Sequence, residues 1–229
     1  MHQSTMSVVE ALKSRRSVRA FLPDQVNQEV LKTILSQAAR APSGSNIQPW
    51  KAHILTGETK AALSQRIKDV QSDPDQDALH TEEFAYYPKH WKSPYIERRR
   101  ALGWGLYSLL GITRDDKQAM KAQHARNFDF FDAPVGLIFT TDRSMEQGTW
   151  LDFGMFVQSV MLLARTFELD TCPQAAFNRY HRLVAEQLSL PDDEIMVCAM
   201  SLGYADHSKI ENTLASERIP AESFVRFHG

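Results

Sequence analysis

The feature that most constrains the fold is the segment 151–167, which is apolar around most of the circumference of a helix. A surface helix carries its apolar side chains along one stripe, whereas a helix that is apolar on most sides has to be buried on most sides. A chain of 229 residues can bury one substantial core. We therefore expect a central helix that packs inside its own subunit and also against a second subunit.

Capping residues and apolar runs divide the rest of the chain into short elements. Ser7 and Glu10 form a capping box, which predicts a helix that ends near Ser14. Asn27 is a good N-cap for a second helix, which stops before Pro42. Further patterns predict strands at 51–56, 134–141 and 195–201, and helices at 58–70, 95–110 and 115–126. Because no repeat or change of composition marks a linker, we expect a single domain over residues 1–229.

Composition and charge exclude several classes of protein. The net charge of -2 gives no drive toward nucleic acid or an anionic membrane. No run of about 18 apolar residues predicts a transmembrane helix, and residues 1–7 lack the apolar core of a secretory signal. Cys172 and Cys198 lack Cys-x-x-Cys spacing and the histidines lack metal-binding spacing, so we expect no metal and a cytoplasmic location.

Two short polar segments carry the strongest functional signal. The first places Arg15, Arg16, Ser17 and Arg19 within five residues. Guanidinium groups grip phosphate oxygens in pairs, and a nearby hydroxyl adds a short hydrogen bond. Cations also stabilise a helix C-terminus, which accounts for Arg15 and Arg16 but not for Arg19. The second segment, 42–50, is a loop of small residues between prolines that allows a flat ligand to approach closely.

These arginines occur without a common nucleotide-binding motif. No Gly-x-Gly-x-x-Gly segment and no phosphate-binding Gly-Lys-Ser/Thr loop is present. Ser43 has no glycine-flanked nucleophile elbow around it, which weakens a hydrolase interpretation. Flavin mononucleotide, with one phosphate and a planar ring, fits this combination of residues.

In their order and spacing, the two polar segments resemble those of the FMN-dependent NAD(P)H nitroreductase family. The resemblance continues at 126–128, 133–136, 171–176, 203–206, 217–220 and 224–227, and so spans nearly the whole chain. It implies an α+β fold with a mostly antiparallel central sheet flanked by helices. It also implies an intertwined homodimer that exchanges a C-terminal strand through residues 224–227, with two FMN molecules at the interface.

The resemblance assigns roles at the phosphate end of the flavin. Arg15, Ser17 and Arg218 would hold the phosphate, and Arg16 would contribute to the phosphate and ribityl region. Family members often carry Lys-x-Arg where this chain has Ser216, Glu217 and Arg218. That departure leaves Arg15 and Arg218 to supply the positive charge that holds the phosphate.

The resemblance also assigns roles around the flavin ring. Arg19 and Asn127 would face the pyrimidine edge, where a cation stabilises the negative charge of reduced flavin. The segment 171–176 would be the turn that passes over the ring, with a backbone amide near Ala175 or Ala176 bonding flavin N5. The residues that would line one ring face are Pro173, Gln174, Ala175 and Ala176, and those that would come from the partner subunit are Pro42, Ser43 and Asn46.

Aromatic residues gather in the segment from about 72 to 115, which resembles an insertion that covers the flavin in some family members. Trp91, Tyr95, Trp104 and Tyr107 would then stack on a flat acceptor and exclude water from the reduced ring. The alternative, which we weigh equally, is that these residues cover the outside of the core.

The implied activity is reduction of nitroaromatic or related electron-poor compounds by NADH or NADPH in a ping-pong mechanism. Flavin N5 carries the chemistry, so no catalytic side chain is expected. Two alternatives remain open: an enone reductase or reductive dehalogenase on the same scaffold, and a flavin-binding protein with little turnover. The expected partners are a second copy of the chain and a small aromatic substrate, with no nucleic acid and no membrane.

Overall fold

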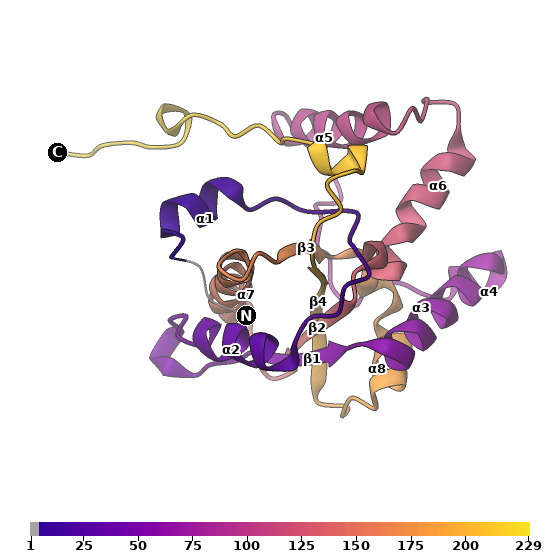
Figure 1. The fold of residues 1–229 in the computed structure, drawn as a ribbon, viewed down its shortest axis with the longest axis horizontal. Helices are drawn as coiled ribbons and strands as arrows, with labels where there is room; N and C mark the ends of the chain where they lie inside the picture. The colour runs from indigo at the N-terminus through magenta and orange to yellow at the C-terminus, as the bar shows by residue number, and fades with distance from the viewer. Residues whose placement is uncertain (1–4) are drawn as a thin grey trace.

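The computed structural model describes residues 5–229 and is organised around a four-stranded sheet (Figure 1). Residues 1–4 of the polar N-terminal segment lie outside the described residues. Every neighbouring pair of strands is antiparallel, in the spatial order β1-β2-β4-β3. The strands are β1 (Lys51–Leu55), β2 (Val135–Asp142), β3 (Asp170–Gln174) and β4 (Glu194–Gly203). The α+β class, the antiparallel sheet and the three strands expected from sequence are confirmed.

The strand β3 corrects the expectation that 171–176 is a turn. Thr171 and Cys172 pair with Leu202 and Ser201 of β4, so the turn begins only after Gln174. The expectation rested on the family resemblance. Pro173 cannot donate to a strand ladder, and it is accommodated here because β3 is an edge strand, where one side of the backbone needs no partner.

Helices cover both faces of the sheet (Figure 1). On one face, α2 (Gln28–Ala38) and α7 (Thr149–Arg165) enclose a core that includes Leu137 and Phe139 of β2. On the other face, α3 (Gly57–Ser72), α8 (His181–Leu188) and the short helices η2 (Arg126–Asp132) and η3 (Ala176–Tyr180) enclose Ile138. Successive residues of a strand point to opposite faces, and β2 is buried at every position from Val135 to Thr141 because both of its faces are covered.

Local sequence signals set the first two helices. The capping box of α1 (Val8–Ser14) is present, with Glu10 N donating to Ser7 Oγ at 3.2 Å and Ser7 N donating to Glu10 Oε2 at 2.7 Å. At α2 the Asn27 side chain accepts from Glu29 N at 2.8 Å. Both predicted helix starts are therefore confirmed.

The helix α7 buries one side and leaves another open. Phe153, Phe156 and Val160 are buried against the sheet and α2, whereas Leu151 is 73% exposed. The central position of the helix is confirmed within the chain. Its contact with a second subunit stays a prediction.

The segment from 72 to 115 forms an excursion from the body of the molecule. It contains α4 (Pro74–Ala78) and α5 (Tyr95–Leu109), and α6 (Lys117–Ala125) returns the chain to the core. Figure 1 shows α5 lying across the top of the molecule, away from the sheet, and all of its side chains are at least partly exposed. The helices predicted at 58–70, 95–110 and 115–126 are confirmed.

The C-terminal segment leaves the body of the molecule. After η4 (Ile210–Thr213), the chain passes beside α5 and runs outward through η5 (Ala221–Ser223), as the yellow trace in Figure 1 shows. Within the described residues of this one chain, 224–227 forms no strand, and Phe227 is 97% exposed. None of the helices built from residues 5–229 has the length and apolar character that crossing a bilayer demands.

Candidate functional site

Residues 15–19 lie along the edge strand β3, directly after the end of α1. Ser17 pairs with Thr171 in a parallel bridge, and Val18 N donates to Thr171 O at 3.1 Å. The Val18 side chain is buried in the core, and Arg19 N donates to Asn212 Oδ1 at 2.8 Å. The backbone of this segment is thus fixed on both sides, which places its arginines beside the sheet edge.

One of these cations, Arg15, lies close to Arg218 of the C-terminal segment. Burial lowers the pKa of Arg15, and the nearby positive charge of Arg218 lowers it further. Among the described residues, no carboxylate forms an ion pair with Arg15, Arg19 or Arg218. Bringing like charges together without an acid is unfavourable unless an anion joins them. This donor set therefore fits a phosphate group.

Ser216 and Arg16, which neighbour these cations in the sequence, have different surroundings. Arg218 Nη1 donates to Ser216 Oγ at 2.7 Å. Ser216 therefore orients the guanidinium and does not itself supply positive charge to a phosphate. Arg16 is exposed and lies close enough to Asp170 for its charge to oppose the burial that raises the pKa of that carboxyl. Arg16 therefore lies near an acid of β3.

Asn127 is held by a buried side chain of β3. Gln174, only 3% exposed, donates from Nε2 to Asn127 O at 2.7 Å and accepts from Ser201 Oγ at 2.7 Å. Asn127 Nδ2 donates to His124 O at 2.8 Å. Gln174 therefore links β4 to the short helix η2 and fixes Asn127 at the cleft wall.

The turn after β3 offers free backbone donors. Within residues 5–229, the amides of Ala175 and Ala176 donate no hydrogen bond to another backbone group, because they open the short helix η3. Such donors suit an acceptor atom of a flat ring placed over the turn.

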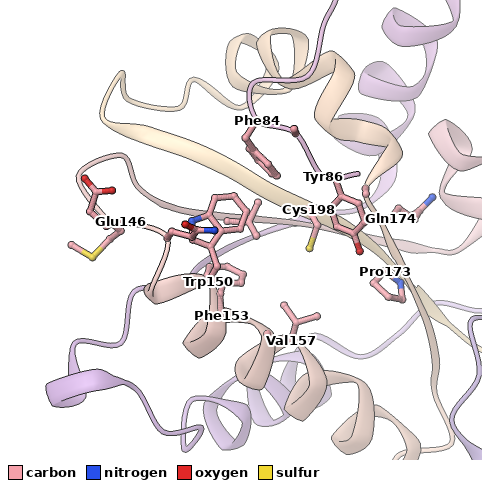
Figure 2. Close-up of a pocket in the computed structure, with 15 residues that line it drawn as sticks. Phe84, Tyr86, Glu146, Trp150, Phe153, Val157, Pro173, Gln174 and Cys198 are labelled. Carbon is pink, nitrogen blue, oxygen red and sulfur yellow. The ribbon is translucent and has the colours of Figure 1, made fainter. Parts of the chain in front are cut away.

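Two clefts flank this turn and share Pro173, Gln174 and Ala175 as a common wall. The smaller cleft, about 360 Å³, also contains Arg19, Asn127 and Ala176. The larger cleft, about 740 Å³, lies between the turn and the first half of α7, and Figure 2 shows Trp150, Phe153 and Val157 on that side. Six of the residues assigned to the flavin ring from sequence, Arg19, Asn127, Pro173, Gln174, Ala175 and Ala176, thus line one cleft.

The aromatic residues of the cleft walls differ in part from those singled out in the sequence. Tyr107 lines the smaller cleft, but Trp91, Tyr95 and Trp104 line neither of the two clefts. Trp91 packs under Arg99 at 5.0 Å, Tyr95 lies near Arg98, and Trp104 packs under Arg114 at 4.8 Å. The larger cleft is instead lined by Phe84, Tyr86 and Trp150.

The sequence held a partial signal for these missed residues. Phe84 and Tyr86 belong to the same aromatic segment, but no periodicity distinguished them from the others. Trp150 immediately precedes the helix predicted at 151–167, so the sequence pattern assigned it neither to that helix nor to the site. Its ring meets Phe84 edge-on at 4.4 Å, which closes one end of the larger cleft.

The loop containing Pro42, Ser43 and Asn46 lies elsewhere on the molecule and lines neither cleft. Gly44 N donates to the buried Asp152 of α7 at 3.1 Å. Ser45, Asn46 and Gln48 all have left-handed backbone, with φ of 50°, 60° and 49°. Non-glycine residues rarely adopt this conformation, and it concentrates at functional sites. Within a single chain, this loop therefore contributes to neither cleft.

The clefts contain no activated side-chain nucleophile. Burial raises the pKa of Cys172 to about 11, although Arg19 and Arg15 lie close by, and burial raises the pKa of Cys198 to about 12. Residues 5–229 hold no group of three or more His, Cys, Asp or Glu side chains suited to a metal ion. The arrangement can bind an anion, present amide donors to a ring and shelter a flat ligand.

Comparison with known proteins agrees with this geometry. The nitroreductase family model matches residues 12–204. A 4-nitrobenzoate reductase from Pseudomonas putida is 43% identical over 94% of this chain and 93% of its own length. A nitrobenzene nitroreductase from Ectopseudomonas oleovorans is 37% identical over 95% of both chains.

Solved structures give the same result. The FMN and NADPH-dependent nitroreductase NfnB from Sphigopyxis sp. strain HMH superposes with a TM-score of 0.93 at 36% identity, covering 98% of this chain and 100% of its own. The FMN-dependent NfnB from Mycobacterium smegmatis, solved with NADPH, has a TM-score of 0.90 at 28% identity and covers 97% and 98% of the two chains.

Proposed function

This chain belongs to the nitroreductase family, and from that premise we propose how its own residues hold FMN and reduce nitroaromatic compounds with NADPH or NADH. The relatives that are reductases of 4-nitrobenzoate and nitrobenzene support the acceptor class, and the FMN and NADPH-dependent structures support the cofactor and the donor. The chain is thus assigned as an NAD(P)H-dependent flavin oxidoreductase.

The observation that carries the proposal is the closeness of Arg15 and Arg218, which form no ion pair with a described carboxylate, beside a turn with free amides. Arg15, Ser17 and Arg218 hold the phosphate, and Arg16 lies along the ribityl chain. Arg19 and Asn127 face the pyrimidine edge, where the Arg19 guanidinium stabilises negative charge on the ring. Pro173, Gln174, Ala175 and Ala176 support one ring face, and the amide of Ala175 or Ala176 donates to N5.

FMN, when bound, supplies the redox chemistry by accepting a hydride from the nicotinamide and passing electrons to the acceptor. The protein supplies binding, orientation and a dry environment. Phe84, Tyr86 and Trp150 exclude water from the larger cleft, and low local polarity strengthens every charge interaction there. Donor and acceptor occupy the same cleft in turn, which gives ping-pong kinetics.

The segment 72–115 acts as a cover over this site. The residues of this segment that contribute to the walls of the two clefts are Glu82, Phe84, Ala85, Tyr86, Tyr87, Leu106 and Tyr107. The chain, residues 1–229, is one nitroreductase-like domain with this segment as an insertion.

A second subunit completes the site. Pro42, Ser43 and Asn46 lie too far from their own chain's clefts to line them, and their strained loop is anchored to α7 through Asp152. The open side of α7 meets its symmetry mate, which carries each loop to the flavin of the other chain. The homodimer thus explains both the exposed face of α7 and the position of the loop.

The phosphate site is tested by substitution of Arg218. Arg218→Ala should weaken FMN binding by about 1.5–3 kcal/mol, the range for hydrogen bonds to charged groups. The measurement is flavin fluorescence titration of apoprotein. The matched control is Arg66→Ala, which removes an arginine from an exposed pair with Glu186 far from the clefts. Equal FMN affinity in both variants would contradict the assignment of Arg218.

The activity is tested with the same variants. Wild type should reduce 4-nitrobenzoate and nitrobenzene with NADPH or NADH, and Arg218→Ala should recover this rate when FMN is supplied in excess. A protein that binds FMN but reduces none of several nitroaromatic, enone and halogenated acceptors would contradict the enzymatic function.

A further inference from the structure

The aromatic segment at the cleft has very little support from its own backbone. Among residues 5–229, positions 81 to 91 take part in no backbone-to-backbone hydrogen bond. The segment has no helix or strand between α4 and α5. Backbone without such bonds opens easily unless side chains hold it.

One carboxylate supplies the polar anchor of this segment. Glu83 Oε1 accepts a hydrogen bond from Arg143 Nη1, and Glu83 Oε2 lies 3.2 Å from His181 Nδ1. The Glu83 and His181 side chains are only 23% and 17% exposed. Both oxygens of the carboxylate are therefore used, on two different elements, and the carboxylate is partly shielded from solvent.

The partners of Glu83 are themselves rigid. Arg143 follows β2, and its guanidinium also donates to Asp192 O at 3.0 Å and Glu194 O at 2.9 Å. Its backbone amide donates to Asp193 O at 2.7 Å. His181 is the first residue of α8. The carboxylate thus joins the loose segment to the end of the β2–β4 pair and to a packed helix.

The residues next to Glu83 face the site. Phe84 packs edge-on against Trp150 and lines the larger cleft together with Tyr86. Tyr87 lines the smaller cleft beside Arg19 and Asn127. Upstream, Asp77 is held by Tyr180 Oη at 2.6 Å and by Arg179, and the His80 ring lies 5.5 Å from that of Tyr180.

We propose that Glu83 is a positioning residue, held between Arg143 and His181, that fixes Phe84 and Tyr86 at the larger cleft and thereby sets the affinity for the aromatic acceptor. The inference rests on the proposed function, since it assigns the acceptor to that cleft. Glu83 touches neither acceptor nor flavin and acts only through the aromatic side chains beside it.

Limited proteolysis of the FMN-loaded protein tests the anchor without reference to activity. Lys89 and Lys92 are exposed trypsin sites in the anchored segment. Glu83→Ala should speed cleavage after these lysines about tenfold, because cleavage follows the population of the opened segment. Glu83→Gln, which keeps neutral hydrogen bonds, should fall between Glu83→Ala and wild type. Glu186→Ala, which breaks the exposed pair with Arg66, is the matched control and should match wild type.

Kinetics with the same variants test the effect on the acceptor. Glu83→Ala should raise KM for nitroaromatic acceptors about tenfold with little change in kcat, the split expected when binding is lost in ground and transition states alike. FMN content and the rate with ferricyanide, a small outer-sphere acceptor, should stay at wild-type levels. Loss of FMN or of ferricyanide reduction in wild type would instead show failure of the proposed function.

Two results would overturn the positioning role. One is a cleavage rate at Lys89 and Lys92 that is the same in wild type and both Glu83 variants. The other is faster cleavage with unchanged KM for every nitroaromatic tested. If Glu83→Ala does not fold, Glu83→Gln decides the question by the same two criteria.

Discussion

At the scale of single residues, Gln174 is a buried side chain whose amide group hydrogen-bonds on both sides. Its amide group satisfies Ser201 on one side and Asn127 on the other, and all three lie in or beside the buried sheet. A buried polar group that loses its partner costs its full desolvation penalty. The conformation of Asn127 therefore depends on a residue that has no need to touch the flavin with its side chain.

Replacing Gln174 tests this dependence. Gln174→Leu leaves Ser201 Oγ and Asn127 O without their partner, so we expect a loss of about 2 kcal/mol in the free energy of unfolding. The FMN dissociation constant should rise about tenfold, because Asn127 is no longer fixed. Urea unfolding and flavin fluorescence titration measure the two effects.

A control variant separates the two consequences. Ser201→Ala removes the other partner but keeps the bond from Gln174 to Asn127, so FMN affinity should be retained. If both variants bind FMN like wild type, Gln174 has no role in positioning Asn127.

Sequence predicted the site residues that follow a local pattern. Arg15 and Arg19 stand in one short segment, and the structure places that segment beside β3 as a unit. Phe84 and Trp150, by contrast, meet across 66 residues of chain. No local signal encodes such a contact, because it depends on how the excursion folds back.

At the scale of elements, the junction of α7 and β3 supports the arginine segment. Arg165 Nη1 donates to Asp170 Oδ1 at 2.7 Å, and Arg165 Nε donates to Ser14 Oγ at 3.3 Å. The Asp170 side chain is 9% exposed. Burial raises the pKa of Asp170 above its ordinary value of 3.8, while the Arg165 charge opposes that rise.

Removing the cation should destabilise this junction in a pH-dependent way. Arg165→Met leaves a buried carboxylate unpaired, so we expect a loss on the order of 3 kcal/mol at about pH 7. A carboxyl with a raised folded pKa stabilises the fold when protonated, and that contribution is lost as pH rises through the folded pKa. Without Arg165 the pKa of Asp170 rises further, so the loss should shrink as pH falls and the group takes up a proton.

Urea unfolding of wild type and variant at about pH 7 and about pH 5 measures this trend. Lys32→Met, which breaks an exposed pair with Glu29, is the control and should show no measurable change at either pH. A loss for Arg165→Met that is independent of pH would argue against an unpaired Asp170.

Elements were predicted from sequence where capping and periodicity agree. The starts of α1 and α2 followed from Ser7 and Asn27, whose side chains cap the helices as expected. The strand β3 was missed because the segment 171–176 was assigned as a turn from the family resemblance. Proline is tolerated in a strand at a sheet edge, and the sequence does not reveal which strand lies at the edge.

At the scale of the whole molecule, several large apolar side chains are exposed on the surface of the single chain. Val8 and Val9 of α1, Leu151 of α7, and Phe224 and Phe227 of the tail are all exposed. Large exposed apolar patches mark interaction surfaces. In Figure 1, α1 and α7 lie on the same side of the molecule, and the tail runs outward on that side. This arrangement supports the proposed homodimer with an exchanged tail.

Truncation tests the assembly. Deleting residues 221–229 should weaken the dimer, because the tail would no longer cover the partner's surface. Sedimentation velocity should show a dimer for the full chain and a concentration-dependent monomer for the truncated chain. A full chain that sediments as a monomer with FMN bound would rule out the shared site.

The fold class was predictable from the sequence. The position of the 42–48 loop, away from the clefts of its own chain, was not. The apolar runs indicated three of the four strands, and the family resemblance implied the antiparallel sheet flanked by helices. The separation of the 42–48 loop from its own clefts depends on where α2 and α7 place it, which no sequence pattern specifies.

The most direct measurement is an anaerobic titration of the purified protein, followed by its visible absorbance. The protein should be yellow, or become so with FMN. NADPH or NADH should bleach the flavin band, and one nitroaromatic acceptor such as 4-nitrobenzoate should restore it. A protein that stays colourless with FMN, or whose bleached band no nitroaromatic restores, would contradict a flavin-dependent nitroreductase.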